Sequence, residues 1–175
     1  MNDKPWLEAL GDLVPDVHPS AFVHRRAVLI GDVTVGPECS IWPNTTLRGD
    51  DGKIVLGARC SVQDGTVIHM TDGMSDACVG DQVTIGHNVT LHGAKVGSNC
   101  IIGMGSVVLD NAEIGDWSIV GAGAVVTMNK KFPPGSLILG SPGRVVRQLS
   151  DKDREWIEYS WKRYVEQAAR YKAQG

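Results

Sequence analysis

The sequence predicts an all-β solenoid, a parallel β-helix of six-residue repeats, followed by one C-terminal α-helix. Three observations lead to this fold class. Aliphatic residues recur with a period of six, which fits neither an α-helix nor an ordinary strand. A small residue usually follows four places later. Glycine is abundant, at 21 of 175 residues, while phenylalanine occurs only twice. That balance is typical of many tight turns rather than a helix-packed core.

The repeat runs through eighteen hexads and breaks register at two loops, residues 49–52 and 71–76. Each aliphatic side chain is expected to point inward, and three hexads would complete a coil that rises about 4.8 Å. Cys39, Cys60 and Cys100 all hold the fifth place of a hexad, so they are predicted to line one interior column. The aliphatic positions are Val17, Val23, Leu29, Val35, Ile41, Leu47, Leu56, Val62, Ile68, Val79, Ile85, Leu91, Val96, Ile102, Val108, Ile114, Val120 and Val126.

The chain, 1–175, is expected to form a single domain of four segments. Residues 1–16 are a lead-in over the open end of the first coil, 17–131 the β-helix, 132–149 a connecting segment rich in Pro and Gly, and 150–173 the C-terminal helix. Ser150 and Asp153 form a capping-box-like start to that helix. The residues that recur at helical spacing, expected to be a packing stripe, are Trp156, Ile157, Trp161, Tyr164, Val165 and Ala168.

Charge and composition exclude several classes of protein. The formal net charge is −3 and no basic run occurs, so nucleic acid is not an expected partner. No apolar stretch approaches the length of a membrane span, and the N-terminus lacks the pattern of a signal peptide, so no membrane association and a cytoplasmic location are expected. The four cysteines contain no CxxC pair, which argues against a cysteine zinc site and a disulfide framework.

Three of the five histidines lie in the stretch 68–93, and they are the candidate functional residues. His69 and His92 both hold the second place of a hexad and are separated by one coil plus five residues. The 71–76 loop can absorb those five residues, so the two imidazoles are expected to stack on one face, about 5 Å apart. Such a pair can bind one metal ion, since Zn–N bonds are about 2.1 Å. His18 and His24 are interpreted as surface residues without a role.

His87 lies five residues before His92, around a corner and on an adjacent face. Five extended residues span up to about 17 Å, so one ion is not expected to reach both within one chain. If two such prisms pack side by side, His87 of one chain completes the pair on its neighbour, and such head-to-tail contacts close as a ring. A homotrimer with metal sites between subunits is therefore predicted.

Other polar residues fall in register with these histidines. Arg48 occupies the place of His69 and His92, one coil below, and Gln63 and Asp64 lie one coil below the strand that precedes His87. A polar cluster is thus predicted on both surfaces of the expected subunit contact.

Three motifs carry a resemblance to a known family. They are Leu47-Arg48-Gly49-Asp50, residues 62–69 (VQDGTVIH) and residues 85–93 (IGHNVTLHG). Together they resemble the γ-class carbonic anhydrases, over about residues 15–165, and most of all the short bacterial members described as hexapeptide-repeat, transferase-like proteins. The resemblance implies a homotrimer of left-handed β-helices with Zn²⁺, or alternatively Fe²⁺, between subunits.

The resemblance also implies roles for individual residues. His69, His87 and His92 match the metal ligands, and Gln63 matches a residue that orients the metal-bound hydroxide or the substrate. Arg48 and Asp64 match an ion pair across the subunit contact, Asp50 an acceptor beside the site, and Tyr159 an aromatic residue near the substrate. The implied reaction is the reversible hydration of CO₂ to bicarbonate, since a metal ion lowers the pKa of bound water to about 7.

The chain departs from that family in two places. The 71–76 loop is short and contains no glutamate that could serve as proton shuttle, so Asp51, Asp72 or Asp76 would have to substitute. Trp161 stands where a small polar residue is expected in fully active members.

Two other functions remain open. Hexapeptide helices also host acyl or acetyl transfer from acyl-CoA, and the Gly140-Ser141-Pro142-Gly143 segment fits that superfamily equally well. Such an enzyme needs one histidine as a general base rather than three at this spacing. The third possibility is a metal-binding trimer with little catalytic activity.

Overall fold

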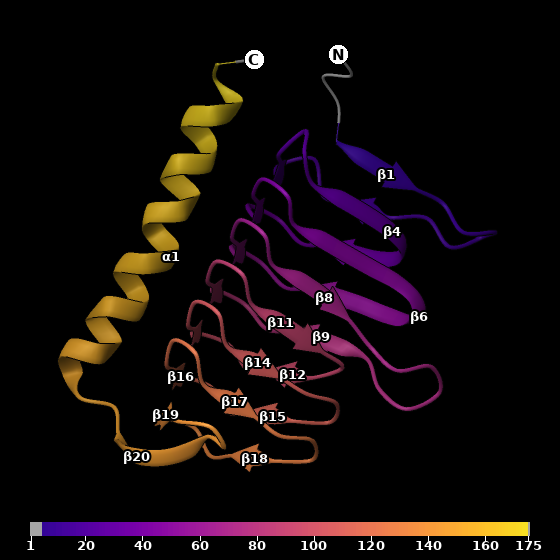
Figure 1. Cartoon of the computed structure of the whole chain (residues 1–175). Helices are drawn as coiled ribbons and strands as arrows, with labels where there is room; N and C mark the ends of the chain where they lie inside the picture. Colours follow the sequence, from indigo (N-terminus) through magenta and orange to yellow (C-terminus); the bar gives the residue numbers. More distant parts are fainter. Residues whose placement is uncertain (1–4, 175) are drawn as a thin grey trace.

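The computed structural model describes residues 5–174, and it is a parallel β-solenoid of about seven turns with one C-terminal helix. The predicted fold class is confirmed. In Figure 1 the helix runs along one side of the stacked coils, and the 71–76 loop projects on the opposite side. Two sheets, of 12 and 8 strands, form the walls of the solenoid. No helix within the described range is both long enough and apolar enough to cross a lipid bilayer.

The 12-stranded sheet bends around two faces of the solenoid, because the long strands β4 and β6 belong to both. We call the face that contains β8 and β11 the histidine face, and the face that contains β9 and β12 the third face. The sheet consists of β1 (Trp6–Glu8), β2 (Asp16–Val17), β4 (Val28–Val35), β6 (Thr46–Leu56), β8 (Val67–His69), β9 (Ala77–Val79), β11 (Thr90–His92), β12 (Lys95–Val96), β14 (Val107–Val108), β15 (Glu113–Ile114), β17 (Val125–Val126) and β18 (Lys131–Phe132).

The 8-stranded sheet forms the remaining face, which we call the helix-covered face. Its strands are β3 (Phe22–Val23), β5 (Ser40–Ile41), β7 (Ser61–Val62), β10 (Thr84–Ile85), β13 (Ile101–Ile102), β16 (Ile119–Val120), β19 (Ser136–Leu139) and β20 (Arg144–Gln148). All of these strands pair in parallel except β20, which turns back antiparallel to β19. The order along the sheet follows the coil, so each strand pairs with its equivalents one turn before and after.

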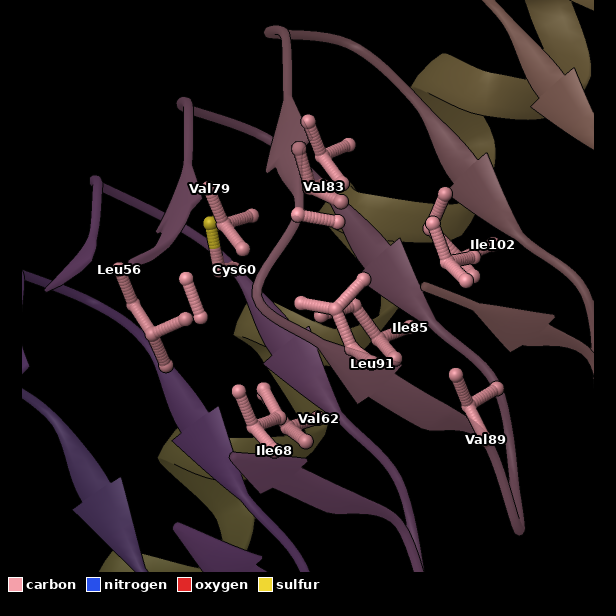
Figure 2. Close-up of a cluster of buried hydrophobic side chains, with 14 of the residues drawn as sticks. Leu56, Cys60, Val62, Ile68, Val79, Val83, Ile85, Val89, Leu91 and Ile102 are labelled. Carbon is pink, nitrogen blue, oxygen red and sulfur yellow. The ribbon is translucent and has the colours of Figure 1, made fainter. Parts of the chain in front are cut away.

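The core is a stack of aliphatic side chains inside the prism. Leu47, Ile68, Leu91 and Val108 are successive partners on the histidine face, and each is fully buried. Figure 2 shows such side chains from all three walls meeting in the interior. All of the predicted aliphatic positions from Leu29 to Val126 are buried, as are the three cysteines of the predicted column. Val17 and Val23, in the first coil, are only partly buried.

Corners of the coil place many residues in the left-handed backbone region. Asparagine tolerates that conformation better than most residues because its short amide can hydrogen-bond locally. Among residues 5–174, Asn occupies five of the nine non-glycine positions with positive φ: Asn44, Asn88, Asn99, Asn111 and Asn129, beside Glu38, Arg59, Gln82 and Trp117.

The coil extends beyond the expected range of 17–131 at both ends. At the start, β1 pairs in parallel with β4, so part of the lead-in is itself a strand. At the end, β18 and β19 continue in register with β15 and β16 as far as Leu139. The physical reason is that Phe132 and Ile138 keep the six-residue period, while Pro133-Pro134-Gly135 forms a corner. Of the expected lead-in, residues 1–4 lie outside the described part of the chain.

Helix α1 spans Asp151–Lys172, one residue inside the predicted bounds at each end. Ser150 is the N-cap and forms a capping box with Asp153, as predicted. The helix packs on β3, β5, β7 and β10 of the helix-covered face. Near its end, Lys172 donates hydrogen bonds to carbonyl oxygens of the first coil, at 3.0–3.4 Å.

Packing of α1 follows the predicted stripe only in part. Ile157 and Ala168 are buried, but Trp156 is 59% exposed and stacks on Tyr159 instead of the coil. The assignment of Trp156 to the packing stripe is therefore wrong. The reason is that Ile157, the next residue, takes the inward position of that turn.

Candidate metal centre

His69 and His92 lie one above the other on the histidine face. They are Cα partners at the ends of β8 and β11, as the hexad count requires. Nδ1 of His69 is 3.3 Å from Nε2 of His92, with ring centroids 5.3 Å apart. Two nitrogens bound to one tetrahedral zinc at about 2.1 Å are about 3.4 Å apart. The spacing of these two nitrogens therefore fits a shared metal ion.

The far side of the His69 ring faces carboxylates. Its Nε2 lies 3.0 Å from Oδ1 of Asp50 and 3.3 Å from Oδ2 of Asp51. Asp50 also accepts a hydrogen bond of 2.5 Å from Arg48. Burial by itself raises the pKa of Asp50, but the hydrogen bonds from Arg48 and His69 outweigh it and lower the pKa below the ordinary aspartate value. An ionised Asp50 can accept a hydrogen bond from a protonated Nε2 of His69. The lone pair of the neutral ring is then on Nδ1, where it can bind a metal ion.

The far side of the His92 ring faces a residue that the sequence reasoning missed. Nδ1 of His92 lies 3.0 Å from Oδ2 of Asp110, and Asp110 is only 6% exposed. Burial raises the pKa of Asp110, but hydrogen bonds from Ser75 and His92 outweigh it and the net shift is downward. The available signal was spacing, because Asp110 follows His92 by 18 residues, which is one coil.

His87 stands apart from the other two histidines. It follows β10 at a corner, its side chain is 41% exposed, and its Nδ1 is 3.1 Å from Oδ2 of Asp64. Across residues 5–174, the one set of three metal-ligating side chains with atoms within 4.8 Å of one another is Asp50, Asp51 and His69. A single chain thus brings together two of the three predicted ligands. Donation of His87 to a neighbouring chain stays a prediction.

The other predicted site residues divide between the two places. Arg48 and Asp50 lie beside His69, and Arg48 forms its ion pair with Asp50 in this chain. Asp64 contacts His87, so the predicted pair between Arg48 and Asp64 would have to form between subunits. Gln63, His87 and Tyr159 line one groove of about 440 Å³ between the coil and α1. Gln63 is 5% exposed there, and Tyr159 is 56% exposed.

The candidates for proton transfer differ in position. Asp51 lies 3.3 Å from His69, and its side chain is 42% exposed. Asp76 instead accepts a hydrogen bond from the backbone N–H of Lys53 at 3.0 Å. Asp72 lies exposed in the loop. Among the three, Asp51 is therefore the one that contacts a predicted ligand. Trp161, the other position at which the chain departs from the γ-class pattern, packs beneath the side chains of Arg59 and Lys162.

Comparison with known proteins finds relatives that are similar over most of the chain. A family profile described as bacterial transferase hexapeptide (six repeats) matches residues 93–127. Protein YrdA of Escherichia coli K12 is 42% identical over 94% of this chain and 92% of its own. A protein of Geobacillus kaustophilus named carbonic anhydrase is 43% identical over 91% of this chain and 87% of its own. The carnitine operon protein CaiE of Escherichia coli O157:H7 is 42% identical over 93% of this chain and 82% of its own.

Two solved structures are similar along nearly the whole chain. The BC4754 product of Bacillus cereus, described as a proposed acetyltransferase, has a TM-score of 0.96 and 38% identity and covers 98% of this chain and 99% of its own. A hexapeptide transferase family protein of Anaplasma phagocytophilum has a TM-score of 0.90 and 34% identity, with the same coverage. Their names point to transferases, whereas the name of the Geobacillus relative points to carbonic anhydrase.

Proposed function

Because the chain belongs to the hexapeptide-repeat transferase family, in which the curated relatives include a protein named carbonic anhydrase, we propose that it hydrates CO₂ reversibly to bicarbonate. The reaction would take place at metal sites shared between the subunits of a homotrimer. Zn²⁺ is the expected ion, with Fe²⁺ as the alternative.

The single observation that carries the proposal is the geometry of His69 and His92. Their facing nitrogens are 3.3 Å apart, and each ring has a carboxylate on its other nitrogen. Ligating histidines typically donate their second N–H to a carboxylate, which holds the ring in the metal-binding tautomer. A catalytic zinc takes three protein ligands and leaves one position open. His87 of the partner subunit would be the third ligand.

The side chains around the site have separate tasks in this proposal. When bound, the metal ion supplies a Lewis acid that allows hydration chemistry at neutral pH. Gln63 can donate an amide N–H to an oxygen of CO₂ or bicarbonate, because it lines the same groove as His87. Asp51 can accept the proton released in hydration and pass it to solvent, because its carboxylate contacts His69 and is 42% exposed.

Stopped-flow measurement of CO₂ hydration tests the proposal. The protein loaded with Zn²⁺, or with Fe²⁺ under anaerobic conditions, is expected to hydrate CO₂ above the metal-free protein. The activity is expected to disappear in His69→Ala. If the metal-replete trimer does not hydrate CO₂, the enzymatic proposal fails, and a metal-binding trimer with little catalytic activity becomes the better account.

Acyl transfer is the second candidate, and a specific observation favours it. The Bacillus cereus structure that matches with a TM-score of 0.96 is described as a proposed acetyltransferase. The groove beside His87 is also lined by Arg163 and aromatic side chains, and a histidine there could serve as the general base that acyl transfer requires. Calorimetric titration of acetyl-CoA into metal-free and metal-loaded protein separates the two functions. Saturable binding independent of metal would favour acyl transfer, whereas its absence favours CO₂ hydration.

A further inference from the structure

The buried carboxylate of Asp110 connects His92 to the 71–76 loop. We infer that Asp110, held in place by Ser75, is a positioning residue that keeps the imidazole proton of His92 on Nδ1 and thereby presents Nε2 to the metal. The effect on metal binding rests on the proposed metal site. The tautomer of His92 does not depend on that proposal and can be measured in the metal-free protein.

Both oxygens of Asp110 are engaged from different segments. Oδ2 lies 3.0 Å from Nδ1 of His92, within hydrogen-bond distance, and Oδ1 accepts from Oγ of Ser75 at 2.5 Å. The side chain of Asp110 is 8% exposed. A carboxylate that accepts at both oxygens and is screened from water has little freedom to rotate. It therefore defines the plane and the direction in which the His92 ring is held.

The tautomer of His92 follows from the chemistry of its partner. An ionised carboxylate has only acceptor oxygens, so the ring nitrogen that faces it must carry the hydrogen. With Nδ1 protonated, the neutral ring has its lone pair on Nε2. That nitrogen is the one that lies 3.3 Å from Nδ1 of His69. Asp50 imposes the corresponding choice on His69 from the other side.

Gly93, immediately after His92, makes room for this arrangement. Its φ is +59°, and a Cβ built at this position would overlap both Oγ of Ser75 and Oδ1 of Asp110. The space that a side chain would fill is thus taken by the Ser75–Asp110 hydrogen bond. The backbone on each side is also fixed, since Gly93 N–H donates to the His69 carbonyl and Asn111 N–H donates to the Gly93 carbonyl.

The hydrogen bond to Asp110 suggests a role for the loop at 71–76, where the register breaks. An uninterrupted coil would run directly from β8 to the third face, whereas the loop brings Ser75 within hydrogen-bond distance of Asp110. Within the loop, Ser75 Oγ accepts from the N–H of Thr71 at 3.4 Å. The loop that is too short for a glutamate shuttle therefore supports a metal ligand.

Asp110→Asn is the principal test, because it keeps the size of the side chain and removes its charge. Zinc affinity, measured by competition with a chromophoric chelator, is expected to fall 10- to 100-fold, the usual loss when the hydrogen-bond partner of a ligating histidine is changed. Asp116→Asn is the matched control: Asp116 holds the same hexad place one hexad on, and it accepts from the N–H of Ser98 at 2.8 Å without touching a histidine. Its zinc affinity should equal that of the wild type.

A second readout does not need metal. Long-range ¹H–¹⁵N spectra of the metal-free protein distinguish the two imidazole tautomers, and the His92 signals are assigned by their loss in His92→Gln. The wild type is expected to show the Nδ1–H form, and Asp110→Asn a mixture or the Nε2–H form. Ser75→Ala, which leaves the carboxylate in place, should shift both readouts in the same direction by less, and it serves if Asp110→Asn does not fold.

The outcomes separate this inference from the proposed function. A wild-type protein that shows the Nδ1–H form but binds neither Zn²⁺ nor Fe²⁺ would refute the proposed function and leave the positioning role of Asp110 standing. A wild-type His92 with its proton on Nε2 would overturn the inference. So would an Asp110→Asn protein, folded by circular dichroism, with unchanged tautomer and zinc affinity.

Discussion

Each of the three candidate histidines has a carboxylate on one ring nitrogen. The pairs are His69 with Asp50, His87 with Asp64, and His92 with Asp110, at 3.0–3.1 Å. His18, by contrast, contacts the hydroxyl of Ser20 on the surface. The carboxylate partners therefore distinguish the candidate ligands from a histidine that caps its own turn.

His69→Ala and His87→Ala are each expected to abolish metal binding, because three protein ligands become two. Metal content of protein purified anaerobically, followed by zinc titration, measures the effect. His18→Ala is the control and should retain wild-type metal content. Equal metal content in His87→Ala and the wild type would show that His87 is not a ligand.

Core residues of the coil should be costly to truncate. Ile102 is fully buried and lies among the side chains shown in Figure 2. Ile102→Ala is expected to reduce the free energy of unfolding by about 2–5 kcal/mol, through lost apolar contacts and the cavity left behind. Val146→Ala, at a side chain that is 52% exposed in β20, should change it by less than about 0.5 kcal/mol. Urea denaturation compares the two variants, and similar losses would contradict the assignment of the core.

At the level of elements, the start of α1 is held by a cluster of charges. Arg147 forms two hydrogen bonds with Asp153, at 2.5 and 3.2 Å, and Ser150 donates to the same carboxylate. The Arg147 guanidinium and the Ser150 hydrogen bonds hold the pKa of Asp153 well below its usual range. This cluster connects β20 to the helix that covers one face of the solenoid.

The lowered pKa predicts a pH dependence of stability. A carboxyl group whose pKa is lower in the folded state stabilises the fold above its unfolded pKa of about 3.9, and the contribution is lost as pH falls through the lower folded value. Asp153→Asn should therefore lower Tm at pH 7, and the difference from the wild type should shrink below about pH 4. Asp151→Asn, in the same turn but outside the cluster, is the control. A Tm difference for Asp153→Asn that is constant between pH 7 and pH 2 would contradict this account.

Most elements could be predicted because each six-residue repeat of a solenoid contains its own inward-facing aliphatic residue. The core from Leu29 to Val126 could therefore be predicted from the sequence. The end of the coil was misplaced, because the Pro133-Pro134-Gly135 corner resembles a terminator while Phe132 and Ile138 continue the period. Trp156 was misplaced because helical spacing alone does not decide which of two adjacent apolar residues faces the sheet.

Only those parts of the candidate site that follow from the strand register could be predicted from the sequence. Counting coils places His69 above Arg48 and below His92, and the strand pairing has that order. Asp110 was missed because its role depends on side-chain contacts with His92 and with Ser75 of the 71–76 loop, which a count of hexads does not determine. The convergence of His87 with the other two histidines depends on contacts between chains, which no count within one chain determines.

For the molecule as a whole, the solenoid has one face covered by α1 and two faces that carry no helix (Figure 1). His69 and His92 lie on one uncovered face, and His87 lies at the corner where the helix-covered face ends. A head-to-tail contact that joins a corner to a face closes as a ring when its rotation permits. The central claim is that each metal ion is held by two histidines of one subunit and one of the next.

Mixing of inactive variants tests that claim most directly. His69→Ala and His87→Ala are unfolded together in equal amounts, refolded and assayed for bound zinc. A shared site needs an intact His69 on one subunit and an intact His87 on the next, so random assembly restores roughly a quarter of the wild-type sites. A mixture of His69→Ala and His92→Ala should restore none, because those two ligands must come from the same chain. Zinc in the first mixture and not in the second is the predicted result. Absence of zinc from both mixtures, in trimers that have demonstrably exchanged subunits, would contradict a site shared between chains.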